Sequence, residues 1–356
     1  MTVAVLASCS AVPRPAGGAA KPGVPVAAPF YVTVDNDGTA SVHDAATGRL
    51  TARVPAGAAW SWAGAAATAD PRVFYLAAGN ATFSRLVLTG GGRLRSLTEV
   101  GAVAGEAVTD PAEVAGGNSG LTGMAVAPDG TMIAFGVLTG QSKGGPAGPA
   151  QLEILNLRSG HWAVYRGPSA TAELSALSWA ADGRHLGYLT EGSGNGTDGA
   201  WILTAGAGGD LLAASHRVTR AVPVNLNDGP YLDGGCGGMA LSGTGTGGAR
   251  DVYRLGMNVA GHKGYLDVTE TDAATGGTIR TVFRDPHGVP SAVRNTKTAS
   301  SVSVAALEPM RPLLTGAGTG ATLLVIDGYG HIYRVDVTDG RSALITTDAA
   351  PLSVAW

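Results

Sequence analysis

The chain is poor in charge: 14% of its 356 residues are Asp, Glu, Lys or Arg, and its formal net charge is −3. It lacks the clustered Lys and Arg residues that mark a nucleic-acid-binding surface. Long apolar runs are also absent, since no stretch approaches the roughly 18 apolar residues of a membrane span. We therefore expect no nucleic-acid partner, and membrane contact only through an N-terminal anchor.

Residues that carry chemistry are scarce and scattered. The seven histidines show no metal-site spacing such as HxH or HExxH. Gly117–Gly120 lacks a spacer residue of the serine nucleophile elbow, and Asp35–Gly38 is better explained as a hairpin turn than as a calcium loop. We expect no catalytic residue, no metal and no cofactor.

Four short apolar runs fill the stretch from Ala172 to Val218, without a helical period. Ala181–Gly183 separates the first two runs and is a turn in which Gly supplies a positive φ and Asp bonds its own backbone. The second run alternates polar and apolar residues, as a half-buried strand does. The runs are Leu174–Ala180, Arg184–Thr190, Trp201–Thr204 and Leu211–Val218. They predict a four-stranded antiparallel meander, which needs stacked neighbours to bury both of its faces.

Related units occur on both sides of this meander. The first hairpin recurs at Gly123–Leu138 and more weakly at Ala65–Leu76, and first strands are expected near residues 60, 120, 174, 236, 298 and 351. The turn of the second hairpin, a D/N followed by T/S or D and then Gly, recurs in Ser41–Gly48, Leu152–Gly160, Thr269–Gly277 and Val335–Gly340. The repeats predict a single all-β domain: a β-propeller with six four-stranded antiparallel blades. A seventh blade within a long insertion, an open stack and two packed sandwiches are the alternatives.

The two ends of the chain complete one blade. Pro351–Trp356 resembles a first strand with nothing after it, and Pro29–Val34 resembles a second strand with nothing before it. Pairing of the C-terminal strand with the N-terminal blade closes the ring and removes the open sheet edge. Trp62, Trp179 and Trp356 are expected to share one position of the first strand and to pack between blades.

The N-terminus is expected to form a segment apart from the propeller. Residues 1–9 end in Leu-Ala-Ser-Cys9, which resembles a bacterial lipobox without its charged start, so that Cys9 is the expected lipidation site. The remnant of a membrane helix and an ordinary chain start are the alternatives. Residues 10–28, rich in Pro, Ala and Gly, are a linker to the propeller at 29–356. If Cys9 is not lipidated, it can form a disulfide with Cys236; otherwise Cys236 is expected to be a small buried residue.

Five long connections are expected to meet at one end of the propeller. They are Ala102–Gly120, Gly140–Ala150, Glu191–Ala200, Thr219–Gly235 and Asp285–Ser300. Rigid scaffolds commonly bind through such loops. The candidate partner-binding residues combine charge with an aromatic or amide side chain, and they are Asn227, Asp228, Tyr231, Asp233, His287, Arg294 and Lys297.

The A/S-x-DG turn, the D-x-x-TG turn and the shared closing blade make residues 29–356 similar to WD-repeat-like and TolB-like propellers. The Ala/Gly-rich composition and the expected N-terminal anchor resemble extracytoplasmic propellers of actinobacteria, either anchored to the cell membrane or secreted. This resemblance implies a cell-envelope binding or scaffolding domain, and we expect a non-enzymatic monomer whose partner is a protein or glycan. The alternative is a hydrolase or lyase at the mouth of the central channel, which requires Asp, Glu or His on three or more first strands.

Overall fold

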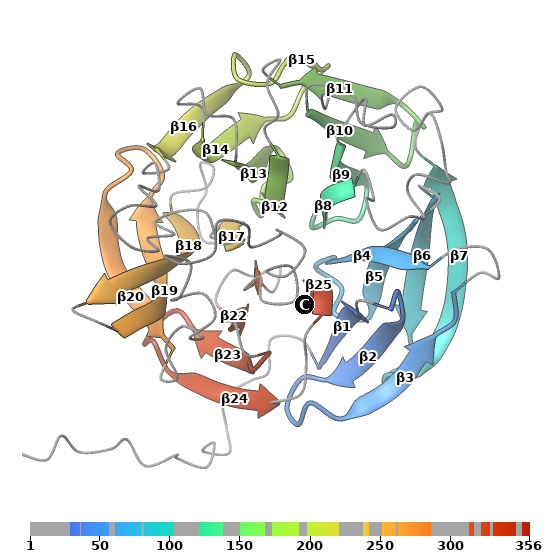
Figure 1. Cartoon of the computed structure of the whole chain (residues 1–356). Helices are drawn as coiled ribbons and strands as arrows, with labels where there is room; N and C mark the ends of the chain where they lie inside the picture. The colour runs from blue at the N-terminus through green and yellow to red at the C-terminus, as the bar shows by residue number, and fades with distance from the viewer. Residues whose placement is uncertain are drawn as a thin grey trace, which may run out of the picture.

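The computed structural model of the chain describes residues 29–35, 37–56, 61–79, 82–102, 121–137, 150–167, 173–191, 198–220, 238–241, 251–260, 263–285, 313–316, 322–327, 330–346 and 351–356. The regular structure within these ranges is all β-strand, and they contain no helix capable of crossing a membrane. Figure 1 shows the strands arranged as blades around a central axis. The segment with Cys9 and the linker at 10–28 lie outside the described residues.

The chain folds as a six-bladed β-propeller, as the repeats predict. Each blade is an antiparallel meander whose first strand lies nearest the axis and whose fourth lies at the rim. From axis to rim, blade 1 is β25 (Pro351–Ala355), β1 (Phe30–Asp35), β2 (Ala40–Asp44) and β3 (Leu50–Val54); blade 2 is β4 (Trp62–Ala67), β5 (Val73–Ala78), β6 (Thr82–Leu88) and β7 (Leu94–Ala102); blade 3 is β8 (Leu121–Val126), β9 (Met132–Val137), β10 (Gln151–Asn156) and β11 (Trp162–Arg166). Blade 4 is β12 (Glu173–Trp179), β13 (His185–Glu191), β14 (Gly199–Thr204) and β16 (Ser215–Arg220); blade 5 is β17 (Gly238–Leu241), β18 (Asp251–Ala260), β19 (Lys263–Asp272) and β20 (Thr278–Arg284); blade 6 is β21 (Leu313–Gly316), β22 (Thr322–Ile326), β23 (Ile332–Asp336) and β24 (Ser342–Thr346).

The core is divided into six hydrophobic clusters, one at each contact between neighbouring blades. Alternate residues of a strand point to opposite faces, so each blade contributes one face to each of two clusters. The cluster between blades 6 and 1 joins Leu324 and Ile332 to Tyr31 and Trp356, so it links the two ends of the chain. Every pair of neighbouring blades therefore shares a buried apolar contact.

Ring closure by the C-terminal strand is confirmed. β25 pairs antiparallel with β1, with Val32 opposite Ala355 and Val34 opposite Ser353. β1 pairs on its other edge with β2, so the two ends of the chain share one sheet, which Figure 1 shows beside the C-terminus.

The predicted second-hairpin turn recurs in four blades with one geometry. In each, the Gly at the fifth position has a φ between 67° and 72° and donates its N–H to the backbone carbonyl of the first residue. The side chain of the first residue accepts a backbone N–H two residues later. A left-handed φ favours Gly, and a short acceptor side chain closes the turn. The four turns begin at Asp44, Asn156, Asp272 and Asp336.

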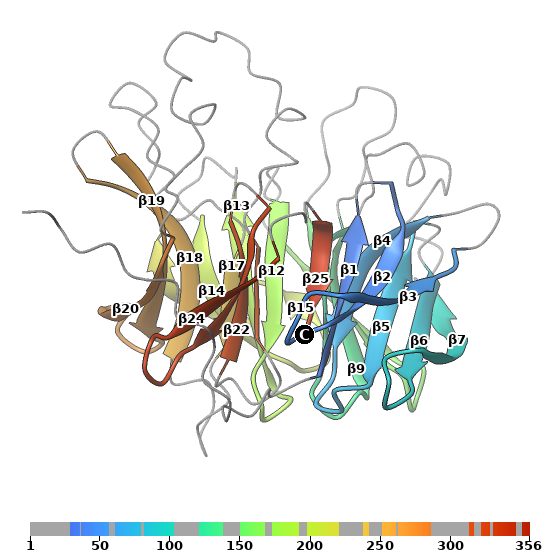
Figure 2. The same ribbon diagram turned by 90° about the horizontal axis from the view of Figure 1, so that it is seen from below.

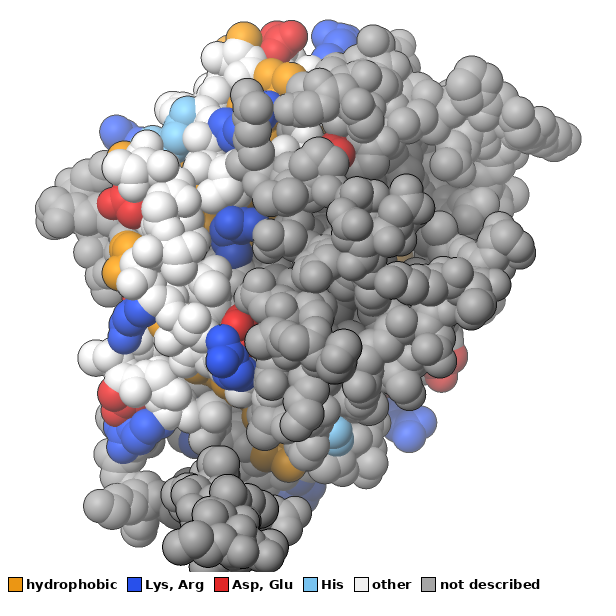
Figure 3. Space-filling model, turned by 60° about the vertical axis from the view of Figure 1, so that its left-hand side comes forward, with side chains coloured by type: hydrophobic (Ala, Val, Ile, Leu, Met, Phe, Trp, Pro, Cys, Tyr) orange, Lys and Arg blue, Asp and Glu red, His pale blue; other side chains and the backbone are white. Residues whose placement is uncertain are grey.

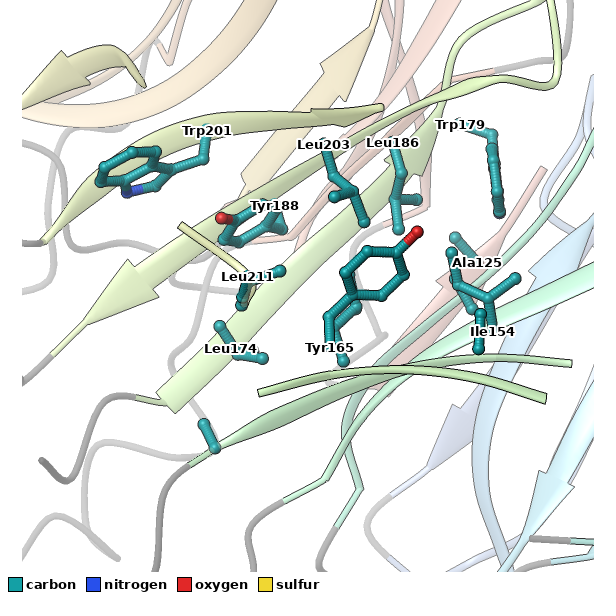
Figure 4. Close-up of a cluster of buried hydrophobic side chains, with 14 of the residues drawn as sticks. Ala125, Ile154, Tyr165, Leu174, Trp179, Leu186, Tyr188, Trp201, Leu203 and Leu211 are labelled. Atoms are coloured by element: carbon teal, nitrogen blue, oxygen red, sulfur yellow. The ribbon is translucent and has the colours of Figure 1, made fainter. Parts of the chain in front are cut away.

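Two features couple neighbouring blades at the strand level. β15 (Gly209–Asp210), from the third connection of blade 4, adds parallel to the rim strand β11 of blade 3. Leu211 then donates its N–H to the Arg166 carbonyl and buries its side chain in the cluster between blades 3 and 4. Figure 4 shows this cluster, with Tyr165, Tyr188, Leu203 and Leu211 among its members. Farther in, β17 meets β21 through a parallel bridge.

The structure corrects one expectation about tryptophan. Trp62 begins β4 and lies opposite Ala78, whereas Trp179 ends β12 and lies opposite Leu186, so the two do not share a position. The residue of blade 2 equivalent to Trp179 is Ala67, because each lies opposite the second residue of the next strand. The turn between the first and second strands sets this register, and the tryptophan does not. The expected packing role is confirmed: Trp62, Trp179 and Trp356 are buried in clusters between blades.

Two further expectations are partly wrong. The first strand of blade 6 begins at Leu313, not near residue 298. The fourth strand of blade 4 was expected at Leu211–Val218, but it is β16 (Ser215–Arg220), and Leu211 lies in the connection at 205–214. That connection is rich in Gly, which makes it resemble a series of turns in the sequence.

Candidate functional site

Every candidate residue from the sequence lies outside the described part of the chain. Asn227, Asp228, Tyr231 and Asp233 belong to the connection from β16 to β17. His287, Arg294 and Lys297 belong to the connection from β20 to β21, and Cys9 precedes β1. Their roles therefore stay predictions, and the described residues at the bases of the same connections define the candidate site.

The strand order assigns all five long connections to one end of the disc. In an antiparallel meander, the links between second and third strands lie at the same end as those from one blade to the next. The five connections are of these two kinds. We call this end the loop end and the opposite one the turn end. Figure 2 shows the disc from the side, with the ten-residue strands β18 and β19 extending beyond the other strands.

Four side chains from blades 5 and 6 meet at the loop end, at the base of the connection that contains His287. Asp285 follows β20 and donates its N–H to the Leu266 carbonyl at 2.8 Å. Asp327 and His331 close the turn between β22 and β23, and Tyr333 follows in β23. We call Asp285, Asp327, His331 and Tyr333, with Phe283 behind them, the blade 5–6 corner.

The Asp327 carboxylate is the centre of the turn in this corner. Its Oδ1 accepts the His331 N–H at 2.8 Å, and its Oδ2 lies 2.6 Å from His331 Nδ1. Asp182 and His185 repeat the arrangement in blade 4, at the turn end, where Oδ2 and Nδ1 are also 2.6 Å apart. Because the pair recurs at the two ends of the disc, its first role is to close a hairpin, and it is no sign of acid–base catalysis by itself.

The ring of Tyr333 packs in the core between blades 5 and 6, but its hydroxyl is unsatisfied within the described part of the chain. Its side chain is 4% exposed, and its hydroxyl has no hydrogen-bond partner among the described residues. Burial raises the pKa of Tyr333, and the carboxylates of Asp285 and Asp327 raise it further. The phenol therefore keeps its proton and can donate or accept a hydrogen bond.

Aromatic rings line the corner beside these polar groups. The centroids of Phe283 and Tyr333 are 5.1 Å apart with the rings tilted by 47°, and His331 meets Tyr333 edge-on at 6.2 Å. Phe283 and Tyr333 also belong to the hydrophobic cluster between blades 5 and 6. The rings are thus held in place by the core.

Two arginines of β20 stabilise the rim of the same blade. Arg284 forms two hydrogen bonds, of 2.8 and 2.9 Å, with the buried carboxylate of Asp267. Arg280 pairs with Glu270 at 2.5 Å and donates to the Val337 carbonyl of blade 6 at 2.6 Å. Figure 3 views this side of the molecule, where basic side chains are interspersed with acidic and uncharged ones. Arg284 thus stabilises blade 5 internally, and Arg280 also joins blade 5 to blade 6.

The described inner strands do not provide the side chains that a channel enzyme requires. β4, β8, β12, β17, β21 and β25 contain one ionisable residue, Glu173. The hydrolase or lyase alternative needs acids or His on three or more of these strands. No group of three side chains suited to a metal ion occurs in the described ranges.

Comparison with known proteins adds no family. No protein-family model and no curated protein match the chain. Among solved structures, tricorn protease aligns over 90% of this chain and 29% of its own, with 13% identity and a TM-score of 0.47. A functionally unknown protein from Desulfotomaculum acetoxidans DSM 771 aligns over 89% of this chain and 78% of its own, with 8% identity and a TM-score of 0.44. The chain thus spans less than a third of tricorn protease, and at these TM-scores neither likeness carries an argument about function.

The blade 5–6 corner was not among the sites predicted from the sequence. Asp285 and Asp327 are separated by the long connection from β20 to β21 and by the two strands β21 and β22, so only the pairing of blades brings them together. One signal was present in the sequence, an Asp followed three residues later by a Gly in the turn between the second and third strands. This turn is Asp35–Thr39 in blade 1 and Asp327–His331 in blade 6. In both, the backbone carbonyl of the Asp accepts the N–H of the Gly.

Proposed function

We propose that this propeller is a non-enzymatic binding or scaffolding module of the cell envelope that presents its loop end to a protein or glycan partner. The observation that carries the proposal is that the four longest gaps between strands, 103–120, 138–150, 221–237 and 285–312, all join strand ends at the same end of a closed ring. Loops on a rigid scaffold are common binding elements, because the scaffold fixes their ends at no further cost in entropy. The two connections that carry the candidate residues flank blade 5.

The path of the chain supports an orientation for this module. The Pro29 carbonyl accepts the Ala45 N–H at 2.9 Å, within the turn that follows β2. The Phe30 ring lies against the turn of blade 2, where a Cβ on Gly92 would come within 2.6 Å of it. Both turns belong to the turn end, so the chain enters the propeller there. A tether at Cys9, with the linker at 10–28, would hold the turn end toward the membrane and direct the loop end away from it.

The placement in the cell envelope rests on the lipobox-like sequence and on the resemblance to extracytoplasmic, TolB-like propellers of actinobacteria. The described inner strands contain Glu173 as their one ionisable residue, and this scarcity supports binding over channel chemistry. We expect the propeller to act as a monomer, with its partner held by charge and hydrogen bonds from loops on both sides of blade 5.

The test is crosslinking in an actinobacterial host that expresses the gene with its upstream region, followed by mass spectrometry. The variant Arg294→Glu/Lys297→Glu reverses two charges of the loop after β20. Its matched control is Arg49→Glu/Arg93→Glu, which reverses two exposed charges at the turn end. We expect the wild type and the control to capture the same partner, and the loop variant to lose it at an unchanged Tm.

Equal capture by both variants would contradict the assignment of the loop end as the binding face. The N-terminal peptide in the same data tests the anchor separately. A lipid-modified Cys9 supports the proposed tether, and an unmodified, uncleaved N-terminus argues against it.

A further inference from the structure

Neighbouring blades cover one another's rim strands in a regular way. In five blades, a glycine with positive φ, in the connection between the third and fourth strands, lies against the rim strand of the preceding blade. A Cβ at each of these glycines would come within 3.2 Å of an atom of that strand. The glycines are Gly48, Gly92, Gly208, Gly276 and Gly340, which lie against β24, β3, β11, β16 and β20 respectively.

The rim strand β7 of blade 2 is the exception. The corresponding glycine of blade 3 is Gly160, and a Cβ there would meet no atom within 4 Å. Within the described ranges β7 pairs with β6 alone, and Figure 1 shows it at the outer edge of the ring. Its residues 94–96, 98 and 99 are exposed. The free edge of a strand presents N–H and C=O groups to which another strand can pair.

The rim of blade 3 shows that this fold accepts an added strand. Blade 4 contributes β15, which pairs parallel with β11. Leu211 follows β15 and is buried in the cluster between blades 3 and 4. An added strand at the rim is therefore compatible with the packing of the blades.

The side chains of β7 indicate which strand fits its edge. Leu97 and Glu99 lie on one face of the blade, because they stand opposite Leu86 and Ser84 in the ladder with β6. Arg95 stands two residues before Leu97. Neither Arg95 nor Glu99 belongs to an ion pair among the described residues. The edge thus calls for a strand with an acid opposite Arg95 and a base opposite Glu99.

β7 itself has this pattern. When two β7 strands pair antiparallel about a two-fold axis at Leu97, each Arg95 lies opposite the Glu99 of the other copy. The same register places Ser96 opposite Thr98. A two-fold contact requires a surface that is complementary to itself in this way.

We propose that two copies of this propeller associate through their β7 edges, as an antiparallel strand pair centred on Leu97. The contact lies at the rim and leaves both loop ends free, so it is independent of the proposed function. One strand from each copy buries less than the roughly 1,200 Å² of a stable complex, so the association is weak. The chain is a monomer when dilute, and it pairs where it is concentrated.

The test is sedimentation of the purified full-length chain under reducing conditions. The concentration is raised to about 1 mM, because a contact of one strand corresponds to weak binding. We expect a dimer whose share grows with concentration. Arg95→Glu or Glu99→Arg alone places like charges opposite each other at two points, and each should weaken the dimer about tenfold. Arg95→Glu/Glu99→Arg restores both opposite pairs and should restore the dimer.

The matched control is Arg93→Glu. It changes the net charge as much as Arg95→Glu does, but Arg93 lies opposite Gly101 in the proposed register, so the dimer should keep its strength. An equal mixture of the Arg95→Glu and Glu99→Arg chains should form mixed dimers, because their charges are opposite at both points. All these positions except Gly101 are exposed, so the Tm should not change.

Sedimentation that does not depend on concentration would overturn the proposal. A double variant as weak as the single ones, or an equal loss with Arg93→Glu, would overturn the register and with it the two-fold β7 contact. Loss of partner capture by the loop variant with the dimer intact would concern the proposed function alone.

Discussion

Ser353 Oγ lies 3.1 Å from the amide nitrogen of Ala65 and accepts its hydrogen bond. This contact joins the inner strand of blade 1, which is the last strand of the chain, to the inner strand of blade 2. Ser178 makes the same bond with the Leu241 amide between blades 4 and 5, also at 3.1 Å. The serine of the first strand thus ties two blades of this ring to their neighbours.

Ser353→Ala should destabilise the ring, because the Ala65 N–H would lose its partner at a site that is 4% exposed. The expected loss is about 1–3 kcal/mol in the free energy of unfolding. Urea denaturation measures it, with Ser96→Ala, on the exposed rim of blade 2, as the control. A loss no larger than that of the control would mean that the closing strand does not depend on this bond.

Glu153 should make the protein less stable as the pH rises. It is 3% exposed in β10, and burial raises its pKa from 4.5 to about 7. The folded state therefore holds this proton more tightly than the unfolded chain, and the associated stability is full below pH 4.5 and is lost as the pH rises through about 7. Glu153→Gln, which stays neutral, should raise the Tm at pH 8 by roughly 2–4 °C and have little effect at pH 5. An equal effect at both pH values would show that Glu153 is not a buried acid.

His43 should make the protein less stable as the pH falls. Burial lowers its pKa from 6.5, while its ring nitrogens lie 3.1 Å from the Gly48 carbonyl and 3.3 Å from Thr33 Oγ1. The unfolded chain takes up the proton first, so stability is lost as the pH falls below 6.5. His43→Asn should reduce the change in Tm between pH 5 and pH 7.5. His161→Asn, at an exposed position, is the control, and a pH dependence that both variants alter equally would argue against His43 as its source.

The pairing of β15 from blade 4 with the rim strand β11 of blade 3 should require a glycine at position 208. Its φ is 96°, and a Cβ there would lie 2.6 Å from the Val164 carbonyl oxygen. Gly208→Ala should displace β15 and expose the edge of β11, and exposed strand edges promote aggregation. Light scattering during heating measures this, with Gly90→Ala as the control, because a Cβ at Gly90 meets no atom within 4 Å. Similar aggregation of the two variants would contradict a protective role for β15.

The fold was predictable because local chemistry repeats in every blade. Turns such as Asp44–Gly48 and Asp272–Gly276 are built by their own side chains and glycines, so their sequence marks the ends of strands without knowledge of the ring. The closing strand was predictable for a related reason: a first strand without a second, and a second without a first, have one way to pair. Where glycine is dense, as at 205–214, the same signals occur within a longer connection instead.

The candidate site was not predictable from the sequence. Tyr333 looks like an ordinary residue of an alternating strand, and the Asp327–His331 turn looks like the structural pair Asp182–His185. The difference arises only when the end of β20 brings Asp285 close enough for its charge to raise the pKa of Tyr333. Patterns within one blade carry no information on what its neighbour brings to the interface.

The most direct test of the account is to ask which end of the ring meets the partner. A photocrosslinking amino acid is placed at Asp37, in the turn after β1 at the loop end, or at Thr47, in the turn after β2 at the turn end, both at exposed positions. Adducts formed in living cells are then compared by mass spectrometry. We predict a specific adduct from position 37 and none from position 47. The same adduct from both positions, or from position 47 alone, would contradict a module that binds through its loop end.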